Sequence, residues 1–579
     1  MKKYGHCLLV IVFFGLLNSC SSYHRDPSEV VVWGLSDPDM LNPILTTAAK
    51  SQDIDNNVFQ PLTNFDYRTL KMIPVLADSL PSVQIDSAGH MLITFEIRKE
   101  AKWDNGSPVT AKDAEFTMKV IKNINVNDDP LRSYYDMVGD FILYPNNPRK
   151  FTILCDYKYM YGPISMGSNT YILPEYNYDS AKVMESFTIK QMHNDKNIMQ
   201  DPKMIAFAKE FNSQKYARDP AHISGSGAYK FTQWVTGQRI TLERKKDWWG
   251  NALAGTSCFF EANASKLIYQ TINDMTSALV SLKGGNIDVM YGIKPQDFNE
   301  LPKSEKFNEN FNTYTPVILA YGYIGINMSS PEFTDIKTRQ AIAHLIDVQR
   351  IIKDIYYGYG QPVIGPMAPT DSLNYNYAIQ PYQYDIDSAK NLLAQAGWTD
   401  SDGDGTLDKI VDGQKINFNV DFLVNAGNES RKNEALMFKE EAHKVGVNVN
   451  VIQQDYNIYL DNLKKHKFDM FIGSWVFQPG PIDFKQIFYT TSRDGGENWV
   501  CFGDSKSDAL LDSIRNEMDE QKRAGMYKRF QWILHEQCGY IFVYAPKGLI
   551  AISKKFSNAY TSANSPFFWE AGFKATAEK

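Results

Sequence analysis

Short apolar runs and amphipathic helical stretches alternate along most of this chain, and this alternation restricts its possible folds more than any other feature. Runs typical of strands occur at 29–33, 91–97 and 446–452, whereas a helical periodicity of apolar residues occurs at 110–121 and 336–352. Strands that alternate with helices are typical of α/β domains, in which helices cover the faces of a sheet. We therefore predict an α/β architecture.

The length and composition of the chain exclude several broad classes of protein. Its 579 residues predict two to four substructures around a large core, because the buried fraction increases with chain length. The 33 Tyr, 33 Phe and 10 Trp exceed what a disordered chain carries. The 60 Lys and Arg, against 67 Asp and Glu, give a net charge of −7 without a long basic run. Because nucleic-acid binding requires clustered cations, we predict no nucleic-acid partner.

The N-terminus has the pattern of a bacterial export signal. Two lysines precede an apolar run over 8–17 that is too short to span a membrane, and a Leu-Asn-Ser-Cys segment follows, ending at Cys20. This segment is similar to the bacterial lipobox, in which the cysteine becomes the lipid-modified first residue. We predict a signal peptide over 1–19, lipidation of Cys20 and a tether over 20–27. A plain signal peptide with an incidental cysteine is the alternative.

Four cysteines remain in the exported protein besides Cys20, namely Cys155, Cys258, Cys501 and Cys538. An even number suits a compartment that permits disulfides, and four cysteines allow three pairings. Four free thiols are an equally good interpretation, because a core of this size needs no covalent support. The sequence leaves both alternatives open.

A resemblance to a known family begins at 98–116, which reads RKEAKWDNGSPVTAKDAEF. This segment resembles the signature of the peptide/nickel class of extracellular solute-binding proteins of ABC transporters. Further landmarks follow in the order of that family over about 500 residues, including PVLAD at 74–78, GSGAY at 225–229, GGNID at 284–288 and YDIDSAKNLLAQAGW at 384–398.

The individual landmarks have architectural interpretations of their own. Thr110, with Asp113 three residues later, predicts the start of a helix with a capping box. Gly225 and Gly227 predict a backbone that turns sharply or passes close to another segment. We assign none of these positions to chemistry.

The resemblance implies a periplasmic-binding-protein-like fold, with two α/β lobes joined by a hinge and an extra domain inserted in the first lobe. A ligand would shift the equilibrium between open and closed lobes. Transferred to this sequence, the inserted domain covers 58–224 and lobe 2 covers 316–539. Lobe 1 consists of three pieces, at 28–57, 225–315 and 540–579.

The resemblance also implies a position for the binding site. In peptide-binding members, a strand that ends in Trp is followed by an Asp that pairs with the α-ammonium of the ligand. Here the strand ends at Trp475, and Gln478 stands in place of that Asp. An amide lacks the charge for a strong ammonium pair, although Asp483 could substitute for it. We predict that the cleft is lined by Trp475, Phe477, Gln478, Asp483, Asn498 and Trp499.

The alternative for these six residues is that the aromatic rings belong to the core and the polar groups to turns.

Other motifs are incomplete. Residues 400–408, DSDGDGTLD, match an EF-hand loop, but Val411 stands where a bidentate Glu should complete the calcium shell. We interpret them as a solvated turn, with a calcium site as the alternative.

No enzyme motif is complete either. The segment HEQCG at 535–539 lacks the second His of a zinc-protease helix, and GSG at 225–227 lacks the spacing of a nucleophile elbow. We predict no catalytic residue, no metal and no cofactor. The resemblance implies a lipid-anchored receptor in the cell envelope that captures an oligopeptide or related polar solute for an ABC permease and its ATPase.

Two other functions remain open at this point. One is a receptor of the same fold that serves sensing or the recycling of cell-wall peptides. The other belongs to a different class, a lipid-anchored hydrolase of envelope peptides. All three functions place the folded body outside the cytoplasm, anchored to a bacterial membrane.

Overall fold

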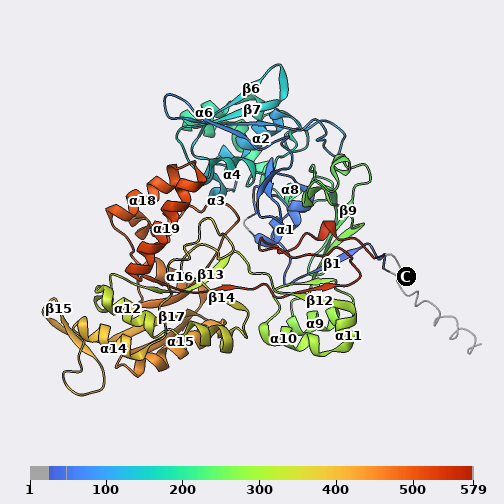
Figure 1. The fold of residues 1–579 in the computed structure, drawn as a ribbon. Coiled ribbons are helices and arrows are strands. Elements are labelled where there is room, and N and C mark those ends of the chain that lie inside the picture. The colour runs from blue at the N-terminus through green and yellow to red at the C-terminus, as the bar shows by residue number, and fades with distance from the viewer. Residues whose placement is uncertain (1–24, 47, 577–579) are drawn as a thin grey trace, which may run out of the picture.

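The computed structural model describes residues 25–46 and 48–576. It has three parts, which Figure 1 shows as an upper inserted domain, a first lobe on the right and a second lobe at the lower left. The predicted signal peptide and Cys20 lie outside the described residues. The end of the predicted tether is described, and there Arg25 forms an ion pair with Asp288 of the first lobe. Within the described ranges, no helix is long and apolar enough to cross a membrane.

The first lobe is built on a seven-stranded sheet in the order β12–β21–β11–β1–β10–β9–β8. Its central strand β1 is buried on both faces and lies parallel to β10 and β11, which explains its continuous apolar sequence. Helices cover both faces. The elements are β1 (Val30–Gly34), β8 (Tyr229–Val235), β9 (Arg239–Arg244), β10 (Lys266–Thr271), β11 (Val289–Met290), β12 (Phe311–Tyr314), β21 (Ile550–Ser553), α1 (Ala49–Val58), α9 (Met275–Lys283), α10 (Pro295–Glu300) and α11 (Glu305–Asn310).

The inserted domain carries a four-stranded antiparallel sheet in the order β4–β5–β7–β6 and a small hairpin, β2–β3. The predicted helix start at Thr110 is confirmed, because its side chain and that of Asp113 form a capping box. The elements are β2 (Thr63–Phe65), β3 (Met72–Pro74), β4 (Ser82–Ile85), β5 (Met91–Glu96), β6 (Val138–Tyr144), β7 (Asn147–Cys155), α2 (Ala111–Lys122), α3 (Asp129–Arg132), α4 (Gly162–Gly167), α5 (Glu175–Tyr178), α6 (Ile189–Asn194), α7 (Pro202–Phe211) and α8 (Lys215–Arg218).

The second lobe is built on a six-stranded sheet in the order β14–β20–β13–β19–β17–β18, with a separate hairpin β15–β16. Helices α12, α14 and α15 pack on one face, and α16, α18 and α19 pack on the other. The elements are β13 (Ala320–Ile326), β14 (Gly360–Pro362), β15 (Asp408–Val411), β16 (Gln414–Asn417), β17 (Asn419–Asn425), β18 (Asn448–Gln454), β19 (Met470–Val476), β20 (Tyr540–Pro546), α12 (Ile336–His344), α13 (Val348–Arg350), α14 (Ile386–Gln395), α15 (Glu429–His443), α16 (Tyr456–Lys464), α17 (Lys485–Phe488), α18 (Ser505–Asn516) and α19 (Glu520–Gln537).

The chain crosses between the lobes twice, and the second crossing differs from the prediction. The first lies between β12 and β13, near the predicted boundary at 315 and 316. The predicted return at residue 540 is wrong, because β20 pairs with β13 and β14 in the second sheet. The return therefore follows Pro546. An apolar strand fits either sheet equally well, and only its pairing partners decide which one it joins.

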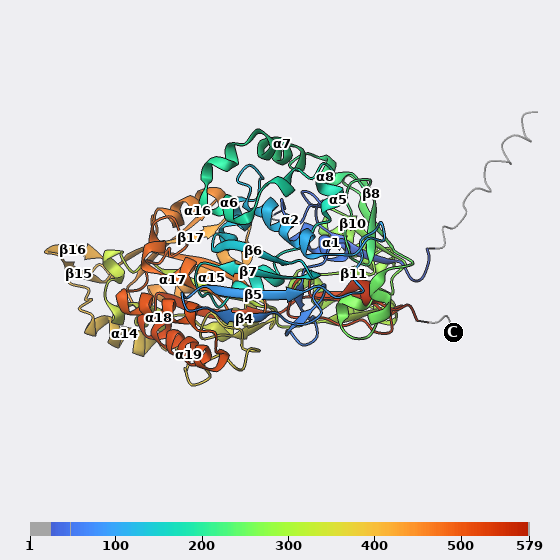
Figure 2. The ribbon, with the colours of Figure 1, turned by 90° about the horizontal axis from the view of Figure 1, so that it is seen from above.

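The two crossings lie side by side and form the hinge. The amide of Gly548 donates to the carbonyl of Pro316 at 2.7 Å, and the amide of Ile318 donates to that of Pro546 at 3.0 Å. Figure 2 shows the parts from above, with β8 and β10 of the first lobe on one side and α14, α18 and α19 of the second on the other. A pair of short connections is the usual basis of hinge motion between lobes.

The glycines at 225 and 227 mark a close approach of two backbones rather than a sharp turn. A Cβ atom on Gly225 would lie 2.2 Å from the carbonyl oxygen of Val58, and one on Gly227 would lie 2.5 Å from that of Asn57. The amide of Gly227 donates to the Val58 carbonyl at 2.9 Å. The chain therefore re-enters the first lobe through a gap that admits only glycine.

Candidate functional site

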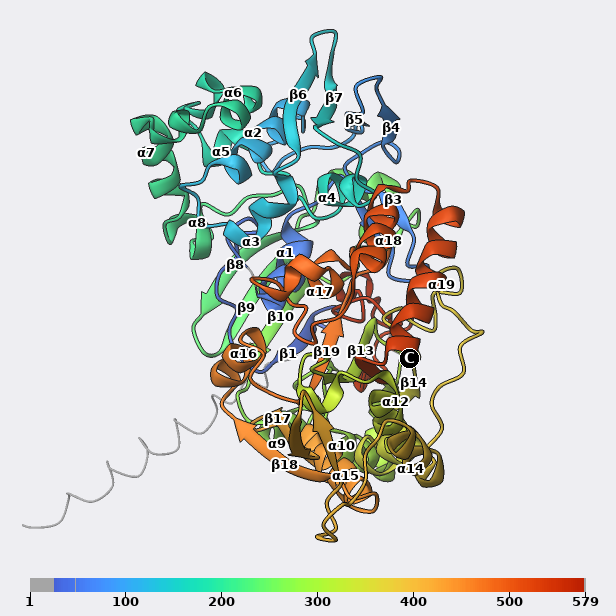
Figure 3. The same ribbon diagram turned by 90° about the vertical axis from the view of Figure 1, so that its left-hand side faces the viewer.

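A cavity of about 500 Å³ lies where the first lobe, the inserted domain and the second lobe meet. Strand β19 of the second lobe points toward the inserted domain, and the loop after it reaches the cavity (Figure 3). The first lobe supplies residues around the start of α1, and the inserted domain supplies several tyrosines. The lining residues are Pro43, Thr46, Gln52, Leu131, Tyr134, Tyr159, Tyr161, Ser168, Asn169, Tyr171, Val476, Phe477, Gln478, Pro481, Ile482 and Asp483.

Three of the six predicted cleft residues, Phe477, Gln478 and Asp483, line this cavity. Trp475 precedes them at the end of β19 and is half-buried. Its ring stacks on Trp499, with centroids 5.7 Å apart and planes inclined by 24°. Trp499 is 8% exposed and belongs to the core of the second lobe. These two rings therefore support the wall of the cavity from behind.

Asn498 does not line the cavity, and its predicted role in the cleft is wrong. The residue is fully buried. Its amide nitrogen donates to the carbonyls of Tyr489 at 3.0 Å and Phe502 at 2.9 Å, and its oxygen accepts from the amide of Phe502 at 2.9 Å. A buried loop must find partners for its backbone polar groups, and this side chain supplies them.

Asp483 lines the cavity, but its charge is already paired. Its Oδ2 atom accepts from Tyr159 Oη at 2.7 Å and from Arg515 Nε at 2.8 Å. The Arg515 guanidinium also lies 5.0 Å from the centroid of the Tyr159 ring. Burial and the adjacent Asp483 carboxylate raise the pKa of Tyr159. Asp483 is therefore not the free anion that a ligand ammonium would need.

The Asp483 contacts connect the second lobe to the inserted domain. The amide of Met160, next to Tyr159, donates to the carbonyl of Arg515 at 2.8 Å. The Met160 side chain is 4% exposed and packs in the core of the second lobe. Residues Tyr159, Met160, Asp483 and Arg515 thus form an interdomain latch beside the cavity.

We expect Tyr159→Phe to weaken this latch, because it removes the hydrogen bond to Asp483 and keeps the ring. A bond to a carboxylate contributes about 1.5 kcal/mol or more, so the Met160 amide should exchange its hydrogen at least about tenfold faster. Hydrogen exchange by mass spectrometry measures this rate. Tyr157→Phe is the matched control, because that side chain is 50% exposed. Equal exchange in both variants would show that the latch does not hold the two parts together.

A second cavity, of about 220 Å³, lies beside the carboxyl end of β19. Arg431, in the first turn of α15, donates to Asn425 Oδ1 at 2.7 Å and to Ser474 Oγ at 2.9 Å. Within the described part of the chain, no carboxylate pairs with Arg431. The cavity is lined by Gly322, Tyr356, Asn428, Ser430, Arg431, Glu434, Ile472, Gly473, Ser474 and Tyr544.

The electrostatics of this second cavity favour an anion. Burial raises the pKa of Glu434 to about 7, and its carboxyl group accepts from Tyr356 Oη. Near neutral pH, Glu434 therefore offsets only part of the charge of the Arg431 guanidinium. Ser474 and Val476 lie on the same face of β19, about 7 Å apart along the strand. Ser474 lines the second cavity and Val476 lines the first, so the two cavities lie beside neighbouring positions of one strand.

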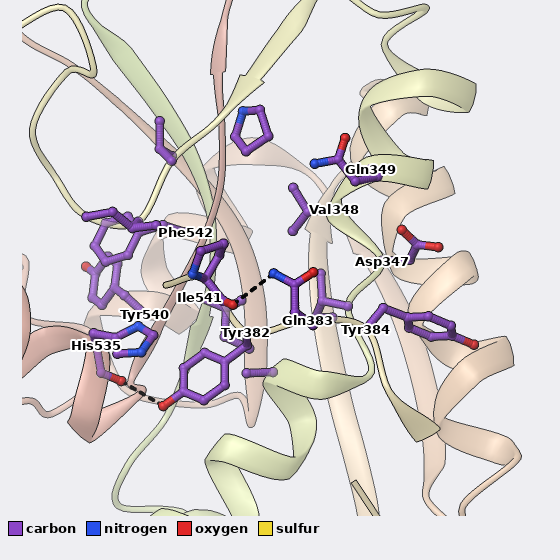
Figure 4. Close-up of a pocket in the computed structure, with 16 residues that line it drawn as sticks. Asp347, Val348, Gln349, Tyr382, Gln383, Tyr384, His535, Tyr540, Ile541 and Phe542 are labelled. Atoms are coloured by element: carbon purple, nitrogen blue, oxygen red, sulfur yellow. Dashed lines mark hydrogen bonds between the residues drawn. The ribbon is translucent and has the colours of Figure 1, made fainter. Parts of the chain in front are cut away.

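A third cavity, of about 190 Å³, lies entirely within the second lobe (Figure 4). Tyr382 Oη donates to the carbonyl of His535 at 3.1 Å, and the two rings stack with centroids 4.5 Å apart. Burial lowers the pKa of His535. Because the first lobe and the inserted domain contribute none of its lining residues, hinge motion cannot close this cavity around a solute.

The acidic turn and the cysteines are also explained locally. Lys415 Nζ lies 2.6 Å from Asp402 and 3.3 Å from Asp408, so an ammonium already balances two of the three clustered carboxylates. This pairing supports the interpretation of residues 400–408 as a turn.

Cys155, Cys258, Cys501 and Cys538 are free thiols in the structure, which agrees with the alternative of four free thiols rather than disulfides.

No sequence pattern indicated the tyrosines of the inserted domain or Arg431 as residues of the site. Tyr134, Tyr161 and Tyr171 occur in unrelated local patterns, and Tyr171 is fixed by a 2.7 Å hydrogen bond to Asn56 of α1. Arg431 follows the helix-capping residue Asn428 and reads as an ordinary solvated arginine. Only the packing of three separate segments brings these groups to the cavities.

Known proteins resemble this chain in both sequence and fold. The family of bacterial extracellular solute-binding proteins, family 5 (middle), matches residues 71–497. The oligopeptide-binding protein AppA of Bacillus subtilis is 26% identical over 90% of this chain and 87% of its own length. The dipeptide-binding protein of Escherichia coli is 24% identical over 90% and 88%.

A solved structure agrees with the fold. NikA from Brucella suis, in complex with Fe(III)-EDTA, superposes with a TM-score of 0.74, covering 95% of this chain and all of that one, at 18% identity. The predicted two-lobe α/β solute-binding fold is confirmed. The chain therefore belongs to family 5 of the bacterial extracellular solute-binding proteins, the peptide/nickel class of ABC-transporter receptors, whose members bind solutes and are not enzymes.

Proposed function

We propose that this protein is a lipid-anchored receptor that captures a peptide-like solute and passes it to an ABC permease and its ATPase. The observation that carries the proposal is the cavity of about 500 Å³ between both lobes and the inserted domain. A solute held there would touch all three parts and favour the closed form. The relatives named for binding oligopeptides and dipeptides support a peptide-like solute.

The charges around the cavities define the chemistry of the solute further. Gln478 is neutral and Asp483 is paired with Arg515, so neither favours strong capture of an ammonium group. Arg431 presents to the second cavity a guanidinium that no described ion pair holds. We infer a solute with an anionic end, such as a free carboxylate, directed toward Arg431, while its body lies among the tyrosines and Phe477.

A thermal-shift screen with pools of short peptides tests this function. A peptide at one hundred times its Kd stabilises the folded protein by about 2.7 kcal/mol, which raises the melting temperature measurably. The same samples, analysed by mass spectrometry, should show intact peptides. If no pool stabilises the protein, or if the pure protein cleaves the peptides, the proposed receptor function is wrong.

The lipid anchor has a separate test. We expect Cys20→Ala to move the exported protein from the membrane fraction to the soluble fraction, because no acyl chain can then be attached. Incorporation of labelled fatty acid into the unaltered protein and its loss in the variant measure this directly. Cys538→Ala, which removes a buried thiol, is the control. Equal membrane retention of Cys20→Ala and the unaltered protein would contradict lipidation at Cys20.

A further inference from the structure

Cys501 and His466 form a pair at the end of the second sheet that lies away from the cleft. The Sγ atom of Cys501 lies 3.4 Å from Nδ1 of His466 and 3.7 Å from Oγ of Ser329. Ser329 follows the end of β13 at Ile326, whereas Ala320 at the other end of that strand pairs with Val476 of the cavity wall. The pair is therefore separate from the binding cavities.

The backbone is strained at both members of the pair. His466 has a φ of 53° and Cys501 a φ of 58°, in the left-handed region that residues other than glycine and asparagine rarely adopt. Each such residue costs of order 1 kcal/mol and persists only where the surrounding structure enforces it. Here two separate loops, one after α16 and one after Asn498, adopt the costly conformation at the point where they meet.

The imidazole of His466 has hydrogen-bond acceptors at both of its nitrogens. Nδ1 lies 2.8 Å from the carbonyl oxygen of Trp499, and Nε2 lies 3.1 Å from that of Arg493. A carbonyl oxygen can only accept, so the 2.8 Å contact at Nδ1 is a hydrogen bond that the ring donates. This Nδ1–H donor also faces the sulfur of Cys501. A thiolate, which is the nucleophilic form of cysteine, is the form that such a neighbour stabilises.

The surroundings of the other three cysteines in the described part of the chain disfavour a thiolate. Cys155, Cys258 and Cys538 are buried, whereas Cys501 is half-exposed. Burial raises the pKa of Cys155 and of Cys538 to about 12, and it also raises that of Cys258. Among the four cysteines that the structure describes, Cys501 is therefore the one at which we expect thiol chemistry on the folded protein.

We propose that Cys501 is a modification site at which a low-molecular-weight disulfide forms a mixed disulfide, with the Nδ1–H group of His466 as the positioning donor. The Cys501 thiolate attacks one sulfur of the small disulfide. A new S–S bond forms as the old one breaks, and the other half leaves as a thiolate, so the small disulfide is the only oxidant that the step needs. Exported proteins meet such disulfides because their compartment is oxidising. The proposal goes beyond solute capture, since neither residue touches a binding cavity.

The test uses the full-length protein and the aromatic disulfide DTNB, with the modified residues mapped by mass spectrometry. We expect the native protein to react rapidly at Cys501, and Cys155, Cys258 and Cys538 to react only after denaturation. His466→Asn should slow the reaction at Cys501 by about tenfold, because it removes the imidazole N–H donor that faces the attacking sulfur. Asparagine is chosen because it tolerates the left-handed backbone at this position.

Two controls make the result decisive. His90→Asn, at an exposed turn of the inserted domain, should leave the rate unchanged, and Cys501→Ser should abolish the rapid reaction. An unchanged rate in a His466→Asn protein that melts like the unaltered one would overturn the role of His466. If the His466→Asn variant does not fold, the reaction rates of the native protein still test the modification site. A reaction at Cys501 no faster than at Cys155 would overturn it.

Discussion

Arg431→Met is expected to reduce affinity for peptides with a free carboxylate by about tenfold to a hundredfold, and to affect their C-terminally amidated counterparts much less. A hydrogen bond to a charged group contributes about 1.5–3 kcal/mol, and the guanidinium can offer more than one. Arg431 is placed for this role because Asn425 and Ser474 orient it toward the second cavity and no described carboxylate forms an ion pair with it.

Isothermal titration with paired peptides, free and amidated, measures the effect. The unaltered protein should prefer the free carboxylate, and Arg431→Met should lose that preference. Arg529→Met is the matched control, because it removes an exposed arginine from α19 and changes the net charge equally. If peptides bind but the amide and the acid bind equally to the unaltered protein, the receptor function stands and the anionic contact is wrong.

Gly225→Ala is expected to destabilise the folded protein by about 3 kcal/mol or more. The added Cβ would lie 2.2 Å from the Val58 carbonyl oxygen, a distance that no relaxation of a flexible side chain can relieve. The two backbones must then separate where the chain returns from the inserted domain to the first lobe. Effects of this size arise from a few mechanisms, and a backbone clash at a glycine is one of them.

Gly525→Ala is the matched control for the same chemical change. Gly525 is exposed within helix α19, and a Cβ there would meet no atom within 4 Å. Alanine in an exposed helix position is more favourable than glycine by roughly 1 kcal/mol, so this variant should melt slightly higher. Thermal and denaturant unfolding of both variants measure the difference. Equal stability of Gly225→Ala and the unaltered protein would contradict the close approach.

The fold was largely predictable because its signals are local and repeated. The capping box at Thr110 and Asp113, the buried apolar strand at 30–34 and the glycines at 225 and 227 each specify a backbone geometry from adjacent residues. The family resemblance then placed these pieces in order. The exception is β20, whose apolar sequence specifies a strand but not the strand beside which it lies.

The site was predictable only in part, because a side chain's role depends on partners far away in the sequence. Phe477 and Gln478 follow a recognisable strand end, and they reach the cavity as predicted. Asp483 reaches it too, but Arg515 and Tyr159 neutralise and hold its carboxylate. Asn498 satisfies loop backbone groups instead. No local pattern distinguishes a free carboxylate or amide from a paired one.

The sequence by itself determined the α/β architecture, the family and the strand that leads to the cleft, because each depends on residues that are neighbours along the chain. The tertiary structure decided which charges are free, since ion pairs and burial join segments hundreds of residues apart. It left Arg431 facing a cavity, tied Asp483 to the inserted domain, and brought Cys501 beside His466. The charge of a site depends on all the side chains around it, and only folding brings these side chains together.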